Sequence, residues 1–583
     1  MKRLTEICRR GILPLLDGDL VALIEIVAEQ MVRKRRCLPA LHSRGRRVGA
    51  GARRLASSAL SEARDWSKAD AGILGALYES LLEPIESGAS REGPRRKSGV
   101  FYTPPRVARF LVGAALNACS RPLRLSPPRI LDPACGGGAF LIAAFRELRR
   151  RYPDEDPQAI ATQCLRGVDS DPDAVHVARL SLLLEAELPD SAWPLLESAV
   201  KVGDSLREGL VDGHRRFPVV VGNPPYRNVK RGIPDELAEF CKANYRSARG
   251  QWDLAAPFVE LALLHLLEAG GACGFIVPSP LLLAENYRPI REIILQNDLV
   301  AFGPAGAPFA DPGVEASLLV VRAAPPKRQL VTVLEGRGKD GIRERRKVPA
   351  TLLRRLPFRV FSHAADPDML RIVFRGLDRG RLVHLGERLT FKRGIECGKR
   401  DNRISEASQA GSGGRPLIVG QSVAPFFARP AHRFKLMKRE KAGSVLKDAR
   451  LWRGKSRLLL RRVADRPIAA VALPPALVLN TLYVVTGDGT DSHSVCALLN
   501  SKPFAELFRQ LYGFEDRLFP YLRVSQLSQV PVPPEMLSDA ELSRCSRDLH
   551  GLASRDPAAL EGAEAVALLD CIDSLVWEAY VRE

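Results

Sequence analysis

The stretch that decides the fold is RILDPACGGGAF, residues Arg129–Phe140. Its apolar start, Arg129–Leu131, predicts a buried strand, and the pattern from Phe140 to Arg150 predicts a helix. The glycines between them allow a tight turn in which backbone N–H groups can approach a ligand closely. Strand, glycine-rich turn and helix in this order are typical of the nucleotide-binding edge of an α/β sheet, although such turns also serve structural purposes.

Outward from this stretch, short apolar runs that end in Asp or Gly alternate with helical patterns between Gly99 and about Arg322. This alternation predicts an open, mostly parallel α/β sheet of the Rossmann-like kind. The expected strands are Arg129–Asp132, Arg166–Asp169, Val219–Gly222, Gly274–Val277 and Ala316–Val321.

The regions on either side of this α/β segment have different sequence patterns. Residues 1–90 read mainly as helix, around Ile12–Val27 and Ile73–Leu82, and we expect these helices to brace the α/β domain. From about Leu382, short strands with turns are followed by helices, which predicts an α+β domain. We therefore expect a helical N-terminal region (1–90), an α/β domain (91–325), a linker (326–381), an α+β domain (382–540) and a C-terminal helical segment (541–583). Within the linker range, the charged stretch Pro325–Lys347 is either a linker or a hairpin.

Length, composition and charge limit the class of protein. At 583 residues the chain is long enough for two or three domains, and a hydrophobic fraction of 46% supports real cores. No apolar run approaches a membrane span, and 11 cysteines without a Cys-x-x-Cys pair indicate reduced thiols. These features predict a cytoplasmic protein without a membrane partner or a bound metal. The net charge of +20 favours a polyanionic partner, but a solvated basic surface explains the charge alone equally well.

Three segments contain an aspartate that could contact a nucleotide-like ligand, and two of these aspartates stand at the end of an expected strand. Asp132 opens the glycine-rich turn, and a carboxylate there suits S-adenosylmethionine, which carries an ammonium group, better than the pyrophosphate of NAD. In Gly167–Pro172, Asp169 is expected to hold ribose hydroxyls and Asp171 to cap the next helix. Asp204 either accepts a hydrogen bond from an adenine amino group or is an ordinary loop residue.

The tetrapeptide Asn223-Pro224-Pro225-Tyr226 follows the apolar run VVVG directly. An aromatic amine is a poor nucleophile because its lone pair is delocalised into the ring. Two acceptors aimed at its N–H bonds, the Asn223 side-chain oxygen and the Pro224 carbonyl, would favour a pyramidal nitrogen whose lone pair points at a methyl group. The prolines hold the backbone rigid, and Tyr226 offers a face on which a planar base can stack. The alternative interpretation is a tight turn after a strand.

Taken in order, these segments resemble the gamma-class N6-adenine-specific DNA methyltransferases of restriction–modification systems, the Taq-type family with a C-terminal target-recognition domain. The resemblance covers nearly all of residues 70–540. Further segments that carry it are Ser98–Pro104, Gln251–Leu267, Phe275–Pro278, Phe309–Ser317, Leu477–Val485, Ala497–Ser501 and Leu527–Pro533.

The resemblance implies roles for individual residues. It implies that residues 91–325 form an S-adenosylmethionine-dependent methyltransferase domain and that residues 382–540 recognise the DNA target. Phe309 would stack on the flipped base opposite Tyr226, and the turn containing Tyr102 would contact the methionine part of the cofactor. The implied cofactor-binding residues are Tyr102, Thr103, Pro104, Asp132, Pro133, Ala134, Gly136, Gly138, Asp169, Asp204 and Ser205, and the implied catalytic residues are Asn223, Pro224, Pro225, Tyr226 and Phe309.

The implied reaction is transfer of a methyl group from S-adenosyl-L-methionine to the N6 of an adenine rotated out of double-stranded DNA, without a metal. We expect a monomer on DNA; whether a separately encoded restriction endonuclease is a partner, and which DNA sequence is read, stays open. The chain departs from the family pattern because Asp132 and Asp169 are unusually far apart, from which we expect an insertion around Arg149–Gln163 that extends a helix. Cys135 in the turn is interpreted as a packing residue.

Three other functions compete with this one. A fused restriction–methylation enzyme would need a nuclease with a Glu-x-Lys triplet, and residues 1–90 contain no such triplet. A protein glutamine methyltransferase shares the Asn-Pro-Pro-Tyr chemistry but has no use for a large basic C-terminal domain. A DNA-binding protein with a decayed site is disfavoured because every catalytic segment is chemically complete.

Overall fold

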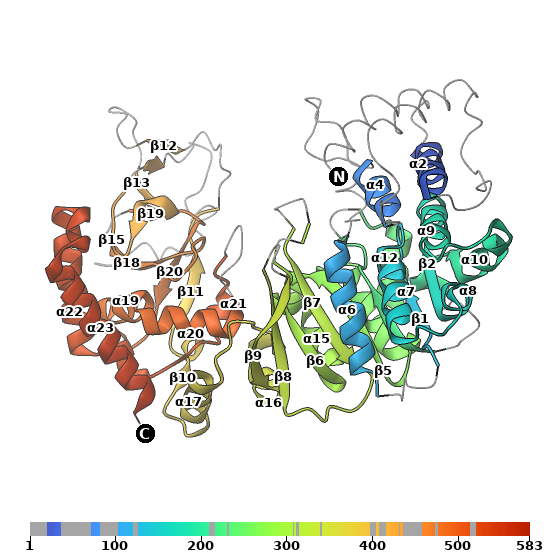
Figure 1. The fold of residues 1–583 in the computed structure, drawn as a ribbon. Coiled ribbons are helices and arrows are strands. Elements are labelled where there is room, and N and C mark those ends of the chain that lie inside the picture. Colours follow the sequence, from blue (N-terminus) through green and yellow to red (C-terminus); the bar gives the residue numbers. More distant parts are fainter. Residues whose placement is uncertain are drawn as a thin grey trace. The chain divides into compact units, whose positions relative to one another are not determined.

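The chain divides into two compact units (Figure 1). Unit 1 comprises Met1–Arg354 and Phe358–His363, and unit 2 comprises Arg355–Pro357 and Ala364–Glu583. The computed structural model describes residues 20–35, 72–81, 103–120, 126–208, 216–229, 232–306, 308–309, 314–337, 341–396, 404–406, 415–430, 432–434, 457–472, 476–513 and 521–582.

Unit 1 is built on a nine-stranded sheet with the order β3-β2-β1-β4-β5-β7-β6-β8-β9. Neighbouring strands are parallel from β3 to β5, β7 runs antiparallel to β5 and β6, and β9 runs antiparallel to β8. The strands are β1 (Ile130–Asp132), β2 (Leu165–Asp169), β3 (Val200–Val202), β4 (Phe217–Gly222), β5 (Leu267–Pro278), β6 (Asp298–Pro304), β7 (Ala316–Arg322), β8 (Leu330–Gly336) and β9 (Ile342–Pro349).

The strand order reverses between β1 and β4, which lie side by side although β2 and β3 come between them in the chain. At such a switch point the loops after the two strands turn to opposite faces of the sheet and leave a crevice at its carboxyl edge. The glycine-rich turn follows β1 and Asn-Pro-Pro-Tyr follows β4. The topology therefore brings the two segments with the clearest sequence signals to one place.

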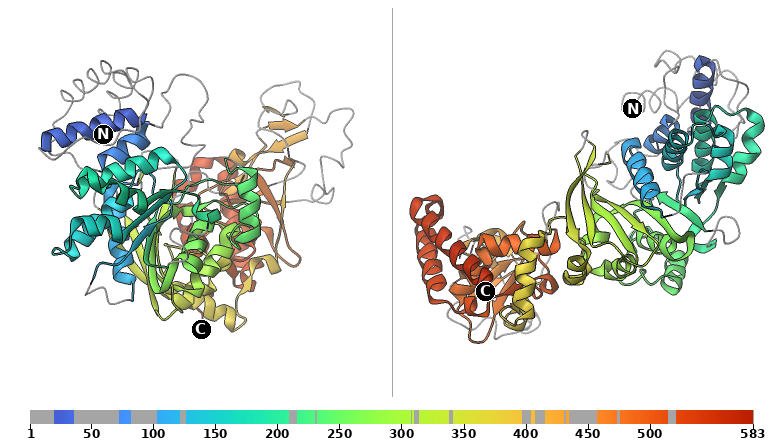
Figure 2. Two further views of the ribbon diagram at one scale, coloured as in Figure 1. Left: turned by 90° about the vertical axis from the view of Figure 1, so that its right-hand side faces the viewer. Right: turned by 60° about the horizontal axis from the view of Figure 1, so that its bottom comes forward.

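Helices cover both sides of this sheet (Figure 2). One group, α6, α7 and α9, packs in a row against strands β1 to β5 and β7, and a second group, α13, α14 and α15, packs against β5, β6 and β7. The helices of unit 1 in these groups and around them are α6 (Pro105–Ala118), α7 (Ala139–Arg151), α8 (Pro157–Ala159), α9 (Pro172–Glu185), α10 (Trp193–Ala199), α11 (Ser205–Glu208), α12 (Asp235–Asn244), α13 (Ala255–Leu261), α14 (Ser279–Leu283) and α15 (Arg288–Gln296).

Two helices from the N-terminal region, α2 (Leu20–Arg35) and α4 (Ile73–Leu81), contact each other and α9. Their apolar side chains belong to the same core cluster as those of α6, α7 and α9. Leu23, Ile26, Leu74 and Leu77 are fully buried there. The expectation that N-terminal helices brace the α/β domain is confirmed for these two.

The expected Rossmann-like fold class is confirmed, and all five predicted strands are present in unit 1. The sequence reading missed β3 and β6. Strand β3 has only three residues, one of which is Lys201, and β6 begins with the buried Asp298 before its short apolar run Leu299–Phe302. Asp298 is stable inside because its carboxylate lies 2.5 Å from Arg322 and 3.2 Å from Arg328.

Of the two alternatives for Pro325–Lys347, a linker or a hairpin, the structure has the hairpin, and the remainder of the range 326–381 is also largely regular structure and not a linker. Strands β8 and β9 pair antiparallel and extend the nine-stranded sheet, and α16 (Ala350–Arg355) and α17 (Pro367–Asp378) follow. The physical reason is that β9, IRERRKVP, is the last strand of the sheet and several of its charged side chains are exposed. An edge strand of this kind has the composition of a linker.

The expectation that the segment around Arg149–Gln163 extends a helix is also wrong. Helix α7 ends at Arg151, and a turn leads to the short helix α8, where Asp156 accepts hydrogen bonds from the backbone N–H groups of Gln158 and Ala159. Pro153 and Pro157 explain this, because proline cannot continue a helix but fits its first turn. The added residues therefore form a separate structural element between β1 and β2.

Unit 2 is an α+β structure, in agreement with the expected C-terminal fold. Its sheets have the orders β10-β21, β11-β20-β17-β18-β15-β14 and β12-β16-β13-β19. The strands are β10 (Val383–His384), β11 (Thr390–Arg393), β12 (Ile404–Glu406), β13 (Arg415–Ile418), β14 (Val423–Ala424), β15 (Phe426–Ala428), β16 (His432–Phe434), β17 (Arg457–Arg461), β18 (Ala469–Ala472), β19 (Leu477–Val478), β20 (Leu482–Thr486) and β21 (Pro531–Val532).

The helices of unit 2 are interrupted where prolines occur. Ser501 ends one helical stretch and caps the next, which has Pro503 in its first turn, and Asp556-Pro557 separates the last two long helices. The helices after α17 are α19 (Ser492–Asn500), α20 (Lys502–Tyr512), α21 (Val524–Leu527), α22 (Ala540–Arg555) and α23 (Ala563–Val581). Among the described helices of the whole chain, none has the length and hydropathy to cross a membrane.

Candidate active site

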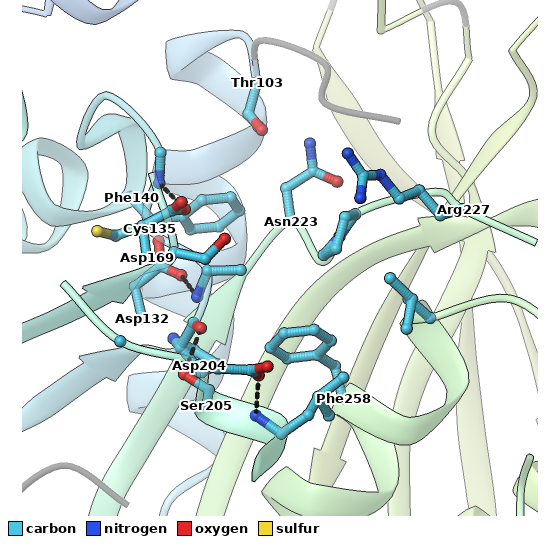
Figure 3. Close-up of a pocket in the computed structure, with 18 of the residues that line it drawn as sticks. Thr103, Asp132, Cys135, Phe140, Asp169, Asp204, Ser205, Asn223, Arg227 and Phe258 are labelled. Carbon is cyan, nitrogen blue, oxygen red and sulfur yellow. Dashed lines mark hydrogen bonds between the residues drawn. The ribbon is translucent and has the colours of Figure 1, made fainter. Parts of the chain in front are cut away.

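A pocket lies at the carboxyl edge of the sheet in unit 1, where the segments after β1, β2, β3 and β4 meet. Figure 3 shows Asp132, Asp169 and Asp204 on one side of it and Asn223 and Arg227 on the other. Its lining residues are Thr103, Asp132, Pro133, Ala134, Cys135, Gly136, Ala139, Phe140, Asp169, Ser170, Gly203, Asp204, Ser205, Leu206, Asn223, Pro225, Arg227, Leu237, Leu254 and Phe258.

The glycine-rich turn is shaped by its own hydrogen bonds. The carboxylate of Asp132 accepts the backbone N–H of Ala134 at 3.1 Å, and the hydroxyl of Ser205 donates to the carbonyl of Pro133 at 2.7 Å. Gly138, the residue before α7, has φ +92°, and a Cβ there would come within 3.2 Å of Ala178. Glycine is required at this position because the backbone is left-handed and α9 packs against it.

Asp169, at the end of β2, ties the turn to the next loop. Its carboxylate accepts the backbone N–H of Gly136 at 2.8 Å and that of Asp171 at 3.0 Å. Burial raises the pKa of Asp169, and these backbone donors act in the opposite direction. Asp171 caps α9 by accepting the N–H of Asp173, so the capping role expected for it is confirmed.

Asp204 is both a pocket residue and a capping residue. One carboxylate oxygen accepts the N–H of Leu206 in the first turn of α11 at 3.0 Å, and the other lies 3.6 Å from the Arg207 guanidinium. Its side chain is only half-buried because it borders the pocket. The two interpretations left open for Asp204 are therefore compatible.

Asn223 and Pro225 line the pocket immediately after β4. A Cβ on Gly222 would lie 2.8 Å from the Asp132 carboxylate, so the absent side chain lets the ends of β1 and β4 approach closely. The loop is fixed from its other end, because the N–H of Leu254 donates to the carbonyl of Arg227 at 2.8 Å. Asn223 is thereby held on a rigid support beside the glycine-rich turn.

Tyr226 and Phe309 come together, as their expected roles require, but with their rings at an angle. The centroids are 5.9 Å apart and the planes meet at 79°, an edge-to-face contact. Neither ring lines the pocket that holds Asn223. Two rings that touch edge to face leave no slot for a base between them, so one ring must turn before both can stack on a base.

The pocket gathers most of the predicted residues and adds others. Pro104, Gly138, Pro224, Tyr226 and Phe309 lie outside its lining, and Tyr102 falls outside the described residues. The sequence reading assigned no role to Arg227, Leu237, Phe140, Leu254 or Phe258. The last two are four residues apart at the start of α13, a spacing that places them on one helix face and could have pointed to them.

Cys135 lies in the lining but its thiol is not activated. Burial, followed by the nearby Asp169 and Asp132 carboxylates, raises the pKa of the Cys135 thiol well above its ordinary value. A reactive cysteine needs the reverse, a thiolate stabilised by positive charge or by a helix N-terminus. Cys135 is therefore suited to packing.

Asp253 is buried next to the loop that follows Tyr226, and we expect it to make the stability of the fold depend on pH. Burial raises its pKa from 3.8 to about 8, opposed by a hydrogen bond from the Ala255 N–H at 3.0 Å. The folded state then keeps a proton that the unfolded state releases, so the free energy of unfolding should fall as pH rises from about 4 to about 8. Asp253→Asn should flatten this fall, measured by urea unfolding across that range. An unchanged slope in the variant would contradict the assignment.

Two sequence families match the chain. The family described as Eco57I restriction-modification methylase matches residues 163–302, and the family described as TaqI-like C-terminal specificity domain matches residues 415–532. The first match covers β2 to β6, and the second lies within unit 2. The chain thus carries an Eco57I-like restriction-modification methylase domain and a TaqI-like C-terminal specificity domain.

Curated relatives are consistent with the match to a restriction-modification methylase. The adenine-specific methyltransferase PglX of Streptomyces coelicolor is 27% identical over 235 residues, which cover 32% of this chain and 18% of that protein. The type II restriction enzyme and methyltransferase RM.Eco57I of Escherichia coli is 25% identical over 293 residues, which cover 40% of this chain and 29% of that protein. The chain therefore matches less than a third of the length of either relative.

Among solved structures, the type IIL restriction-modification enzyme MmeI in complex with DNA has a similar fold. The two align with a TM-score of 0.60 and 12% identity, over 100% of this chain and 90% of the other. At this identity the likeness concerns the fold alone.

Proposed function

We propose that this chain, with a restriction-modification methylase domain followed by a TaqI-like specificity domain, transfers a methyl group from S-adenosylmethionine to the N6 of adenine in a specific double-stranded DNA sequence. The observation that carries the proposal is the position of Asn223. It lies across one pocket from three carboxylates, Asp132, Asp169 and Asp204. A nucleotide-like ligand held by the carboxylates would therefore be within reach of the group suited to orient an amine.

The pocket lining fits S-adenosylmethionine in its chemistry. The carboxylates supply acceptors for an ammonium group, for ribose hydroxyls and for an adenine amino group. Apolar surface for a purine ring comes from Phe140, Leu206, Leu237, Leu254 and Phe258. When bound, this cofactor supplies an electrophilic methyl group on a sulfonium.

The chain's own residues would prepare the amine for attack. The side-chain oxygen of Asn223 and the carbonyl of Pro224 would accept its two N–H bonds and so localise the nitrogen lone pair. Pro224 and Pro225 keep that backbone from moving, and the bond between Leu254 and Arg227 holds the loop from the other side. The proton lost after transfer needs no dedicated base, since the product cation is strongly acidic.

The adenine must leave the duplex to reach this loop, and aromatic faces recover part of that free energy. Tyr226, the last residue of the Asn-Pro-Pro-Tyr loop, contacts Phe309, and rotation of one of these rings would open a stacking slot between them. Arg227 lines the same side of the pocket and adds positive charge where a DNA phosphate would be favoured. Sequence reading in the grooves would be the task of the specificity domain.

Incubating the purified chain with tritiated S-adenosylmethionine and unmethylated plasmid tests the proposal. We expect label in the DNA, resistant to removal of protein, and N6-methyladenine at one recurring sequence when the product is sequenced. A plasmid already methylated by the same chain serves as the control and should accept no further label. Label in protein instead of DNA would favour glutamine methylation and overturn the proposal.

A further inference from the structure

Helix α4, from the N-terminal region, lies directly on the glycine-rich turn. A Cβ on Gly75 would lie 2.6 Å from the carbonyl oxygen of Gly137, and a Cβ on Gly137 would lie 2.6 Å from the Cα of Gly75. The backbone of α4 therefore packs directly on the backbone of the glycine-rich turn. Any residue larger than glycine at either position would prevent this close approach. Gly137 sits between Gly136, which lines the pocket, and Gly138, which precedes α7.

A second contact joins α4 to the loop after β2. The hydroxyl of Tyr78 donates to the carboxylate of Asp171 at 2.9 Å. The N–H of Asp171 donates to Asp169 at 3.0 Å, and the same Asp169 carboxylate accepts the N–H of Gly136 at 2.8 Å. Tyr78 is thus connected by three successive hydrogen bonds to the turn that Gly75 touches directly.

Helix α4 also packs against helix α2. Helix α2 contacts both α4 and α9, and the imidazole of His176 on α9 lies 3.2 Å from the carboxylate of Glu25 on α2. Both side chains are almost completely buried, with exposed fractions of 2% and 0%. Because the Glu25–His176 pair is buried, water cannot replace either partner if the helices shift. The pair therefore fixes the position of α2 along α9.

We propose that α4 is a positioning element for the cofactor site: through Gly75 and Tyr78 it sets the conformation of the glycine-rich turn and of Asp169 in which the cofactor binds. Neither residue lines the pocket, so both act through Gly137 and Asp171. The inference rests on the proposed function, since it names what prepares that site. It gives the N-terminal region a role in cofactor affinity beyond stabilising the fold.

Two variants and two matched controls test this. Tyr78→Phe removes one hydrogen bond, and Gly75→Ala forces α4 away from the turn. Tyr580→Phe removes a buried hydrogen bond of similar length, 2.8 Å to Pro531 in unit 2, and Gly551→Ala adds a methyl group to a helix position with open space around it. The dissociation constant of S-adenosylmethionine is measured by calorimetry, and kcat and KM by methyl transfer to DNA.

For Tyr78→Phe we expect the dissociation constant and the cofactor KM to rise roughly five- to tenfold, which is the effect of one lost hydrogen bond. We expect kcat at saturating cofactor and the KM for DNA to stay within about twofold. Gly75→Ala should raise the cofactor KM further, and both controls should match the wild type. A merely structural role would lower the active fraction, and so kcat, without changing cofactor affinity.

Hydrogen exchange on the unmodified protein gives an independent measurement that does not require the variants to fold. Cofactor binding should slow amide exchange in Ile73–Leu81, and exchange in α22 should not change. If the wild type binds cofactor but Tyr78→Phe binds it equally tightly and Ile73–Leu81 shows no protection, this inference is wrong while the proposed function stands. If the wild type binds no cofactor, the proposed function itself fails, and the inference with it.

Discussion

Replacing Asn223 by alanine is expected to lower kcat for methyl transfer by at least about a hundredfold, the usual cost of losing one preorganised acceptor or donor at a reacting centre. The loss should be in kcat because, in the proposed mechanism, Asn223 would face the amine. The carboxylates, which lie on the other side of the pocket, would hold the cofactor. Single-turnover transfer with saturating cofactor and DNA measures the chemical step, and calorimetry measures cofactor affinity separately.

Asn117→Ala is the matched control for this variant. Asn117 is an exposed asparagine near the end of α6 in the same unit, hydrogen-bonded to Arg151 at 2.8 Å, and does not line the pocket. It should keep wild-type kcat. Retention of more than about a tenth of the wild-type rate by Asn223→Ala would mean that the asparagine is not the acceptor that orients the amine.

Asp169→Ala is expected to weaken cofactor binding by roughly 10- to 100-fold, corresponding to about 1.5 to 3 kcal/mol for hydrogen bonds to a charged group. The substitution removes the acceptor proposed for the ribose. It also removes the acceptor for the N–H groups of Gly136 and Asp171, so the glycine-rich turn is no longer hydrogen-bonded to the end of β2. The pKa of Asp169 is raised, which also predicts how cofactor affinity depends on pH. As pH falls through that pKa, the carboxylate is protonated and the affinity for the cofactor should fall.

Asp156→Ala is the matched control, because Asp156 is another aspartate that accepts hydrogen bonds from backbone N–H groups. Asp156 accepts the N–H groups of Gln158 at 3.2 Å and Ala159 at 3.1 Å, away from the pocket lining. It should destabilise the fold slightly and leave the cofactor dissociation constant unchanged. Equal weakening by Asp156→Ala and Asp169→Ala would show that the effect is general destabilisation, and the ribose assignment would be wrong.

The parts of the fold that could be predicted are those with local causes. The strand before the glycine-rich turn, the cap at Asp171 and the loop after β4 each follow from a few adjacent residues, and the structure has them where expected. The charged composition of β9 left a linker and a hairpin open, and only its place at the sheet edge decides between them. Sequence shows which residues are polar but not which strand is last.

The residues of the candidate site likewise fall into those that could be predicted from a local motif and those that could not. The residues brought together by the switch point between β1 and β4 were found from their motifs, since the topology of such sheets fixes where those motifs meet. Arg227 and Leu237 were missed because neither belongs to a motif, although Arg227 directly follows Tyr226. Gly75 and Tyr78 were missed because their partners are about 60 and 93 residues away, so that only packing reveals them.

The edge strand β9 has a consequence for how molecules of this protein meet at high concentration. A last strand exposes backbone N–H and C=O groups that can pair with the same edge of another molecule and seed aggregates. Strand β9 carries Arg343, Arg345, Arg346 and Lys347 against a single acidic residue, Glu344, and it ends in Pro349, which has no N–H to donate. The β9 strands of two molecules would therefore repel each other. The strand that completes the sheet thus also opposes the pairing of sheets from different molecules into a fibre.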